Sequence, residues 1–175
     1  QSDCAARHDM TRRDYFDIIH KKTASLIAVS ASAGAMAAGA SQERVALMHR
    51  FGEAVGMAFQ IQDDILDYTR TAHTGKPANN DLREGKITLP LLAVLERTDG
   101  DRRRELLAKL ASCGRDEAAV EYLQRIVENG GGLTAAAEVM RGYLAKATDM
   151  PAGYEACPAR SALADLCLYI AERDR

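Results

Sequence analysis

The stretch 59-FQIQDDILD-67 places three aspartates, Asp63, Asp64 and Asp67, inside one of the most apolar segments of the chain. Apolar residues that recur at helical spacing predict a helix from about residue 41, where Ser41 can cap it, to about residue 70. Like charges this close together on a helix repel each other and weaken it. We therefore expect a positively charged partner for the three aspartates.

Length and composition predict a single all-α domain over residues 1–175. The chain has 175 residues, of which 47% are hydrophobic and 27% charged, with only four prolines. A chain of this length can bury one hydrophobic core. The net charge of −2, with acids and bases interspersed, provides no broad basic face for a nucleic acid. Any phosphate chemistry must therefore come from local lysines.

The cysteines and the apolar runs predict a cytoplasmic protein without an integral membrane segment. Cys4, Cys113, Cys157 and Cys167 form no CxxC pair, which favours reduced thiols over a zinc site or a disulfide framework. The run 24-ASLIAVSASAGAMAAGA-40 is shorter than the roughly 18 to 20 residues of a membrane span and contains three serines. The beginning, 1-QSDCAARHDM-10, lacks the basic and apolar regions of a signal peptide.

Helical periodicity recurs along the chain and predicts a bundle of about seven helices. Thr11 and Asp14 mark the start of a first long helix that runs towards Gly39. The segment 71-TAHTGKPANNDLREGK-86 loses periodicity and is predicted to be a loop with short turns. Thr88 is the expected N-cap of a helix to about residue 96. Further helices are expected over residues 101–112, 115–129, 133–149 and 158–173.

The aspartates form part of a polar stripe on the predicted helix. Gln60, Asp63, Asp64 and Asp67 lie at spacings that share one helical face. One interpretation is a solvated acidic face. The other is a cradle for Mg²⁺, which prefers carboxylate oxygens, waters and the phosphate oxygens of a substrate.

Nearby lysines favour the metal interpretation. Lys76 and Lys86 each follow a glycine, Asp81 lies between them, and Lys22 is next to Thr23 on the first predicted helix. Lysine binds phosphate as a compact point charge, although a single lysine is more often a solvated surface residue. Carboxylates together with several lysines in a nearly neutral protein indicate a diphosphate bridged by Mg²⁺.

A longer pattern around these residues resembles a known family, the trans-type isoprenyl diphosphate synthases. The similar segments are 22-KTASL-26, 52-GEAVGMAFQIQDDILDY-68 and 75-GKPANNDLREGKITLPL-91, and the likeness is strongest to medium- and long-chain polyprenyl members. This combination is far more specific than DDxxD alone. The resemblance extends from Gln1 to the tail 166-LCLYIAERDR-175.

The resemblance implies a helical bundle of the isoprenoid synthase type and a Mg²⁺-dependent prenyltransferase. Such an enzyme condenses isopentenyl diphosphate with an allylic diphosphate. The matching positions would supply the metal ligands Asp63, Asp64 and Asp67, with Asp81 in support; the diphosphate-binding catalytic cations Lys22, Lys76 and Lys86; and the substrate-lining residues Thr23, Phe59 and Gln60. From the residues alone, Thr23 could equally be an intrahelical hydroxyl and Gln60 a surface amide.

Small residues on the first predicted helix admit two interpretations. Ala28, Ser32, Gly34 and Ala35 could line a tunnel for a growing prenyl chain, as the resemblance implies, or allow two helices to approach closely. The spacing favours close packing.

The chain departs from the family pattern in carrying only the second of its two aspartate motifs. The first motif would precede Gln1, so the chain resembles the C-terminal half of a synthase and is expected to be inactive alone. Proteolysis or a partial sequence, a truncated gene, and a second chain that supplies the first motif are the competing explanations. We favour the first because every matched site residue is intact.

An unusually apolar helix predicts further contacts. Residues 54 to 66 should be buried on most sides, which implies a partner chain or a dimer, and the resemblance adds a homodimer.

Two alternatives to the catalytic interpretation are a non-catalytic subunit of a heteromeric synthase and a terpene cyclase. The retained aspartates and lysines disfavour the first alternative, and the segments 75-GK-76 and 85-GKITLPL-91 disfavour the second. In the family that the chain resembles, product length depends largely on residues just upstream of the first motif.

Overall fold

The computed structural model describes residues 10–69 and 78–173, and these residues contain helices, turns and loops but no strand. This confirms the predicted all-α class. The described residues group into two compact units, one with residues 10–15, 63–69 and 78–137 and the other with residues 16–62 and 138–173. The single domain over residues 1–175 stays a prediction. We call the first group unit 1 and the second unit 2, and describe each by itself.

The first helix, α2 (Arg12–Ile19), begins at the predicted Thr11 and Asp14. The Asp14 backbone N–H donates to Thr11 Oγ1 at 3.2 Å, and the Thr11 backbone N–H donates back to Asp14 Oδ2 at 3.0 Å. This reciprocal arrangement is a capping box. The hydrogen bonds from Thr11 lower the pKa of the Asp14 carboxyl below its usual range.

The long helix predicted from Thr11 to Gly39 is interrupted by a π-helix, His20–Ala24, before α3 (Ser25–Ala37) continues. The Ser25 backbone N–H bonds the carbonyl of His20, five residues back, which is the wider π spacing. A π turn holds one extra residue without breaking the helix, so hydrophobic periodicity gives no sign of it. The segment 22-KT-23 lies inside this turn.

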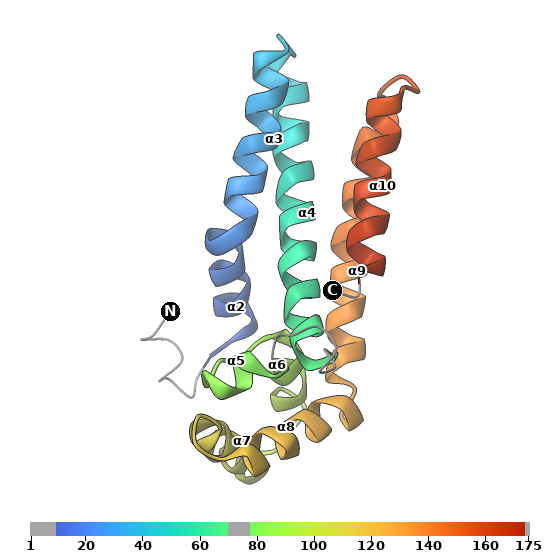
Figure 1. Cartoon of the computed structure of the whole chain (residues 1–175). Helices are drawn as coiled ribbons and strands as arrows, with labels where there is room; N and C mark the ends of the chain where they lie inside the picture. Colours follow the sequence, from blue (N-terminus) through green and yellow to red (C-terminus); the bar gives the residue numbers. More distant parts are fainter. Residues whose placement is uncertain (1–9, 70–77, 174–175) are drawn as a thin grey trace. The chain divides into compact units, whose positions relative to one another are not determined.

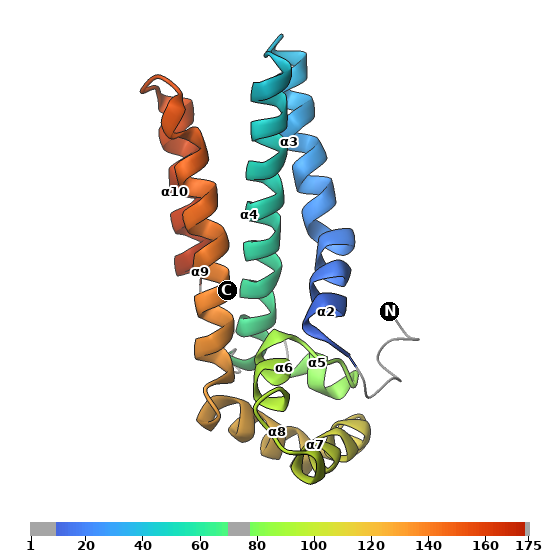
Figure 2. The same cartoon turned by 180° about the vertical axis from the view of Figure 1, so that it is seen from behind.

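In unit 2, α3 packs tightly against the first part of α4 (Gln42–Thr69), and both views show the two helices side by side (Figures 1 and 2). A Cβ added to Gly56 would lie 2.5 Å from Ala24 Cα, and one added to Gly52 would lie 2.8 Å from Ala28 Cα. Ala24 and Ala28 are fully buried. Close packing, the interpretation that the spacing favours, is therefore confirmed for Ala28.

The C-terminal part of unit 2 is formed by α9 (Gly132–Asp149), from residue 138 onward, and α10 (Pro158–Glu172), joined by the 3₁₀ turn Met150–Gly153. Both helices match their predicted ranges closely. Met140, Leu144 and Ile170 supply buried apolar surface. The rings of Phe16 and Tyr143 meet edge to face with centroids 6.2 Å apart.

Unit 1 is built around α6 (Leu89–Leu95), whose seven residues are all buried. The helix α8 (Glu117–Asn129) contacts α6, α7 (Gly100–Ser112) and the short α5 (Asn80–Arg83). Buried residues of this core include Leu82, Leu91, Leu95, Leu106, Leu123 and Val127. The sequence predicted each of these helices except α5, which lies in the segment expected to be a loop. The first part of that segment, residues 71–77, is outside the described residues.

Side chains cap α7 and α8 at their starts. Asp99 accepts a hydrogen bond from Arg102 N, and Asp116 accepts one from Ala119 N. Thr88 occupies the predicted N-cap position of α6, but its side chain makes no capping hydrogen bond. The predicted N-cap position of Thr88 and the proline in the first turn, Pro90, are therefore confirmed.

The apolar part of α4 is largely covered within the described chain. Ala54, Val55, Met57, Ala58 and Ile61 are each no more than 6% exposed. The exposed large apolar side chains lie on other helices, namely Leu26, Val29 and Met36 of α3 and Leu166, Leu168 and Tyr169 of α10. Burial of α4 is thus confirmed, and the surface available to a partner lies on α3 and α10 instead.

Among the described residues, Cys113, Cys157 and Cys167 are free, and burial raises the pKa of the Cys113 and Cys167 thiols. Within residues 10–69 and 78–173, none of the helices combines the length and hydrophobicity that crossing a bilayer requires.

The contact of Gly56 with α3 predicts a stability loss on substitution. Gly56→Ala forces a methyl group against the backbone of Ala24 and should lower the free energy of unfolding by about 1–3 kcal/mol. The control is Gly142→Ala in α9, where an added Cβ meets no atom within 4 Å and should raise that free energy by about 0.5–1 kcal/mol. Urea denaturation followed by circular dichroism measures both, and equal effects would contradict the close approach.

Candidate functional site

The polar stripe of α4 is mostly buried rather than solvated. Gln60, Asp64 and Asp67 are each 5% exposed, and Asp63 is partly exposed. A solvated acidic face is therefore the wrong interpretation for Asp64 and Asp67. A buried carboxylate is costly unless donors or cations satisfy it, so the partners of each aspartate indicate its role.

The Asp64 carboxylate is held by a tyrosine from α2. The Tyr15 hydroxyl donates to Asp64 Oδ2 at 2.7 Å, and Tyr15 itself is only 3% exposed. Hydrogen bonds to a charged acceptor are shorter and stronger than neutral ones. Tyr15 thus stabilises the ionised carboxylate at the end of α4.

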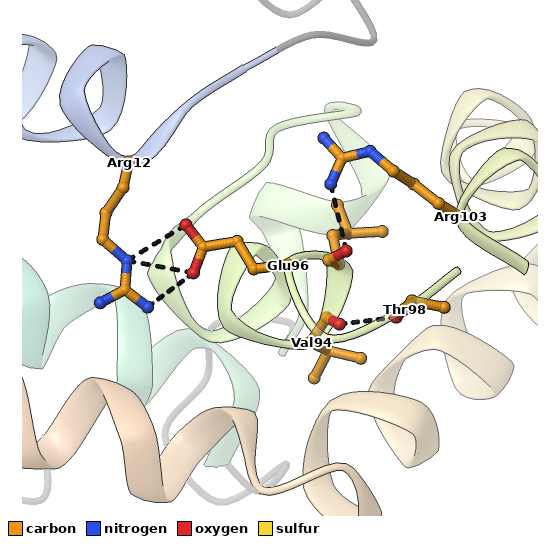
Figure 3. Close-up of polar contacts among 6 residues, drawn as sticks. Arg12, Val94, Glu96, Thr98 and Arg103 are labelled. Atoms are coloured by element: carbon orange, nitrogen blue, oxygen red, sulfur yellow. Dashed lines mark hydrogen bonds and ion pairs between the residues drawn. The ribbon is translucent and has the colours of Figure 1, made fainter. Parts of the chain in front are cut away.

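The start of α2 lies just before Tyr15 in the sequence and is held by an exposed ion pair (Figure 3). The Arg12 guanidinium faces the Glu96 carboxylate, with Nε 3.1 Å and Nη2 2.7 Å from Oε2. Glu96 directly follows α6. Figure 3 also shows Arg103, whose Nη1 donates to the Leu95 carbonyl at 3.1 Å. The end of α6 is therefore attached to both α2 and α7.

The Asp67 carboxylate accepts two backbone N–H groups. Asn80 N donates to Oδ1 at 3.2 Å, and Asp81 N donates to Oδ2 at 2.9 Å. The Asp67 carbonyl also accepts Asn79 N at 2.7 Å. Three successive N–H groups of the returning chain are thus bound to one residue of α4.

Lys86 lies between two carboxylates. Its Nζ is 3.2 Å from Asp81 Oδ1 and 2.5 Å from Glu84 Oε2. The hydrogen bond that Lys86 donates to Glu84, with a further contribution from the one to Asp81, raises the pKa of the Lys86 ammonium. Lys86 is therefore charged at neutral pH and held next to Asp81.

Two buried hydroxyls lie near these acids. Tyr68 is 1% exposed and Thr88 is 7% exposed, and neither hydroxyl makes a hydrogen bond with the described residues. Burial raises the pKa of the Tyr68 phenol, and the negative charges of Asp81, Asp64 and Asp67 add to the effect. Tyr68 therefore stays neutral, which avoids adding a further negative charge to an acidic region.

Unit 2 contains the remaining described residues of the predicted site. The Thr23 hydroxyl donates to Gln60 Oε1 at 2.7 Å. The alternatives of an intrahelical hydroxyl for Thr23 and a surface amide for Gln60 are therefore wrong. Lys22 is exposed on the π-helix. The Arg173 guanidinium lies over the Phe59 ring, with its Cζ atom 4.3 Å from the ring centroid.

The structure brings together some predicted site residues and leaves others separate. Asp67, Asp81 and Lys86 form one connected network in unit 1, and Thr23 and Gln60 form a pair in unit 2. Lys76 lies outside the described residues.

Within residues 10–69 and 78–173, no three His, Cys, Asp or Glu side chains converge closely enough to hold a metal ion by themselves. The donor chemistry nevertheless fits Mg²⁺, which commonly takes one or two carboxylates and completes its shell with waters and phosphate oxygens.

Sequence reasoning missed the residues that hold these acids in place. Tyr15 is 49 residues from Asp64, and nothing near either residue indicates the contact. Asn79 adopts a left-handed backbone conformation with φ 61° and donates from Nδ2 to Gln124 Oε1 at 2.8 Å. Asparagine tolerates this conformation better than most residues, so the Asn-Asn pair before Asp81 was the available signal.

Comparison with known proteins identifies the family. The family model described as Polyprenyl synthetase matches residues 1–128, which is more than half of the chain. The chain belongs to the polyprenyl synthetase family. This confirms the resemblance seen in its sequence.

Individual relatives agree with this assignment. The chain is 36% identical over 169 residues to the short chain isoprenyl diphosphate synthase of Methanothermobacter thermautotrophicus, covering 96% of this chain and 51% of the relative. It is 40% identical over 171 residues to heptaprenyl diphosphate synthase component 2 of Geobacillus stearothermophilus, covering 96% and 52%. The chain therefore spans about half the length of these relatives.

A solved structure shows the same fold. The chain matches a polyprenyl synthase from Caulobacter crescentus CB15, complexed with calcium and isoprenyl diphosphate, with a TM-score of 0.89 and 32% identity. The match covers 98% of this chain and 52% of that one. The isoprenoid synthase type of helical bundle is thereby confirmed.

The buried contact between Tyr15 and Asp64 predicts a loss of stability when the donor is removed. Tyr15→Phe leaves the Asp64 carboxylate without this hydrogen bond and should lower the free energy of unfolding by about 1.5–3 kcal/mol. Tyr169→Phe, on an exposed side chain of α10, is the matched control and should change it by less than about 0.5 kcal/mol. Chemical denaturation measures both variants, and a Tyr15→Phe protein as stable as the control would contradict the proposed role of this bond.

Proposed function

We propose that this chain provides a diphosphate-binding part of a prenyltransferase that joins isopentenyl diphosphate to an allylic diphosphate. The observation that carries the proposal is the network of Asp67, Asp81 and Lys86 at the end of α4, in a chain of the polyprenyl synthetase family. The Asp81 carboxylate of this network fits a hard cation, and the Lys86 ammonium group fits a phosphate.

The carboxylates have distinct places in this proposal. Asp63, Asp64 and Asp67 of α4, with Asp81 in support, form the acidic side of the site. Asp63 is the most exposed of the α4 aspartates, and Asp64 accepts a hydrogen bond from the Tyr15 hydroxyl. Mg²⁺ bound on this side would offset the negative charge that collects on a departing diphosphate.

The lysines provide the cationic side of the site. Lys86 is already charged and positioned next to Asp81. We propose that Lys22 and Lys76, which match the family pattern, also contact the diphosphate. In the reaction, the bond between C1 of the allylic group and the diphosphate oxygen breaks, and the diphosphate leaves with the electron pair. Positioned ammonium groups lower the barrier because they need not reorganise as that charge develops.

The new carbon–carbon bond forms between C1 of the allylic group and the double bond of isopentenyl diphosphate, and a proton is then lost. Thr23, Phe59 and Gln60 are proposed to line the substrate site. The hydrogen bond between Thr23 and Gln60 supports this, because it gives both side chains a fixed orientation.

We place the reaction in the cytosol, as the free thiols in the described residues support.

A second candidate function is that of a subunit in a heteromeric synthase. One relative is itself named component 2 of a heptaprenyl diphosphate synthase. The exposed Leu26, Val29 and Met36 of α3 provide an apolar surface that a partner chain or a second copy could cover. The retained carboxylates and Lys86 favour a catalytic subunit over a non-catalytic one.

The proposed function can be tested in a chimera. The chain replaces the matched segment of the Methanothermobacter synthase, and the chimera is assayed with Mg²⁺, farnesyl diphosphate and radiolabelled isopentenyl diphosphate. We expect elongation, and Asp63→Asn should lower kcat/KM by about 100-fold or more because it removes a charge from the acidic side. Asp165→Asn, an exposed aspartate of α10, is the matched control and should leave the rate unchanged.

An inactive chimera that folds correctly would count against the proposal. The isolated 175-residue chain provides a second measurement, since we expect only weak binding of Mg²⁺ and diphosphate and no turnover. Elongation by the isolated chain would overturn the expectation that a further segment is required.

The ion pair between Lys86 and Glu84 predicts a change in substrate affinity. The Glu84 carboxylate competes with a diphosphate for the same ammonium group, so Glu84→Gln should lower KM for the allylic diphosphate in the chimera by up to about fivefold. Glu121→Gln, on an exposed position of α8, is the control. An increased KM would show that Glu84 assists binding rather than competing with it.

A further inference from the structure

The three aspartates of α4 differ in what their carboxylates bind. Both oxygens of Asp67 accept backbone N–H groups, from Asn80 at 3.2 Å and from Asp81 at 2.9 Å. Asp64 accepts a side-chain hydroxyl instead. Asp67 thus binds the backbone of the returning segment, residues 79–81.

This returning segment starts with a strained residue. Asn79 is 5% exposed and has φ 61° and ψ 33°, a conformation that residues other than glycine seldom adopt. Such strain persists only where the surrounding structure holds the residue in place. Asn79 N is bound by the Asp67 carbonyl at 2.7 Å, and its side chain is bound by Gln124 at 2.8 Å.

The same segment leads to two residues of the proposed site, Asp81 on the acidic side and Lys86 on the cationic side. Asp81 follows the strained turn, its carbonyl accepts Lys86 N at 2.8 Å, and its carboxylate lies 3.2 Å from Lys86 Nζ. A continuous series of contacts therefore leads from Asp67 through Asp81 to Lys86. Loss of the first contact would release the other two residues.

We propose that Asp67 is a positioning residue, which acts through the backbone N–H groups of residues 80 and 81 to place Asp81 and Lys86, rather than a metal ligand. The proposed metal set then narrows to Asp63, Asp64 and Asp81. The positioning role itself stands on the geometry alone. Its link to diphosphate rests on the proposed function.

Amide hydrogen exchange in the 175-residue chain, without metal or diphosphate, tests the positioning role. Asp67→Asn keeps one acceptor oxygen but presents an NH₂ group to the other backbone donor. We expect exchange over residues 79–86 to speed up by about tenfold or more, as the segment opens more often. Asp63→Asn, on the same helix face, should keep the exchange rate over residues 79–86 within about twofold of the rate in the chain without substitutions. Unchanged exchange in Asp67→Asn would overturn the proposal.

Asp67→Glu provides a second variant in case Asp67→Asn does not fold. It keeps the charge but moves the carboxylate outward by one methylene group, so it should also speed up exchange over residues 79–86. Circular dichroism establishes that each variant is folded. Exchange in Asp67→Glu that matches the unchanged chain would likewise overturn the proposal.

Binding of Mn²⁺ in the presence of inorganic pyrophosphate, followed by electron paramagnetic resonance, distinguishes positioning from ligation. Asp63→Asn should weaken Mn²⁺ binding by about tenfold or more, whereas Asp67→Asn should change it by less than about threefold. Equal weakening by both variants would identify Asp67 as a ligand and overturn the proposal. Failure of the unchanged chain to bind Mn²⁺ and pyrophosphate would count against the proposed function, while the exchange experiment would still decide the role of Asp67.

Discussion

Two buried carboxylates at the end of α4 constrain much of unit 1. Asp64 and Asp67 are each 5% exposed, and a carboxylate at that depth is stable as an anion only when donors surround it. The donors come from distant parts of the chain, the Tyr15 hydroxyl and the backbone of residues 80 and 81. Satisfying these acids therefore also fixes where the chain enters α2 and where it returns to form α5.

The sequence predicted most helices because their signals are local. These signals act over a few residues, and the structure contains the features that they predict. They are hydrophobic periodicity, the capping residues at Thr11 and the proline in the first turn of α6. The π-helix His20–Ala24 and the short α5 escaped prediction for a different reason. A π turn adds one residue without disturbing the apolar pattern, and α5 depends on hydrogen bonds to Asp67, which lies before the loop.

The site was predictable as a set of residues but not as a set of contacts. The stripe on α4 identified Gln60 and the aspartates from spacing alone. Their partners lie far away in sequence, since Thr23 is 37 residues from Gln60 and Tyr15 is 49 residues from Asp64. The backbone of residues 24–28 packs against Gly52 and Gly56, and this packing brings the Thr23 region to α4. No periodicity encodes such a pairing.

Lys86 shows how an acidic site can remain stable before any ligand binds. Its ammonium group is shared by Asp81 and Glu84, which offsets part of the negative charge collected near the end of α4. A diphosphate that bound Lys86, as we propose, would therefore exchange one anionic partner for another instead of meeting a bare cation. Because Asp81 also fixes the backbone N–H of Lys86, this exchange can proceed while the lysine stays in position. The net gain on binding then depends on how readily the exposed Glu84 leaves, and much less on moving the backbone.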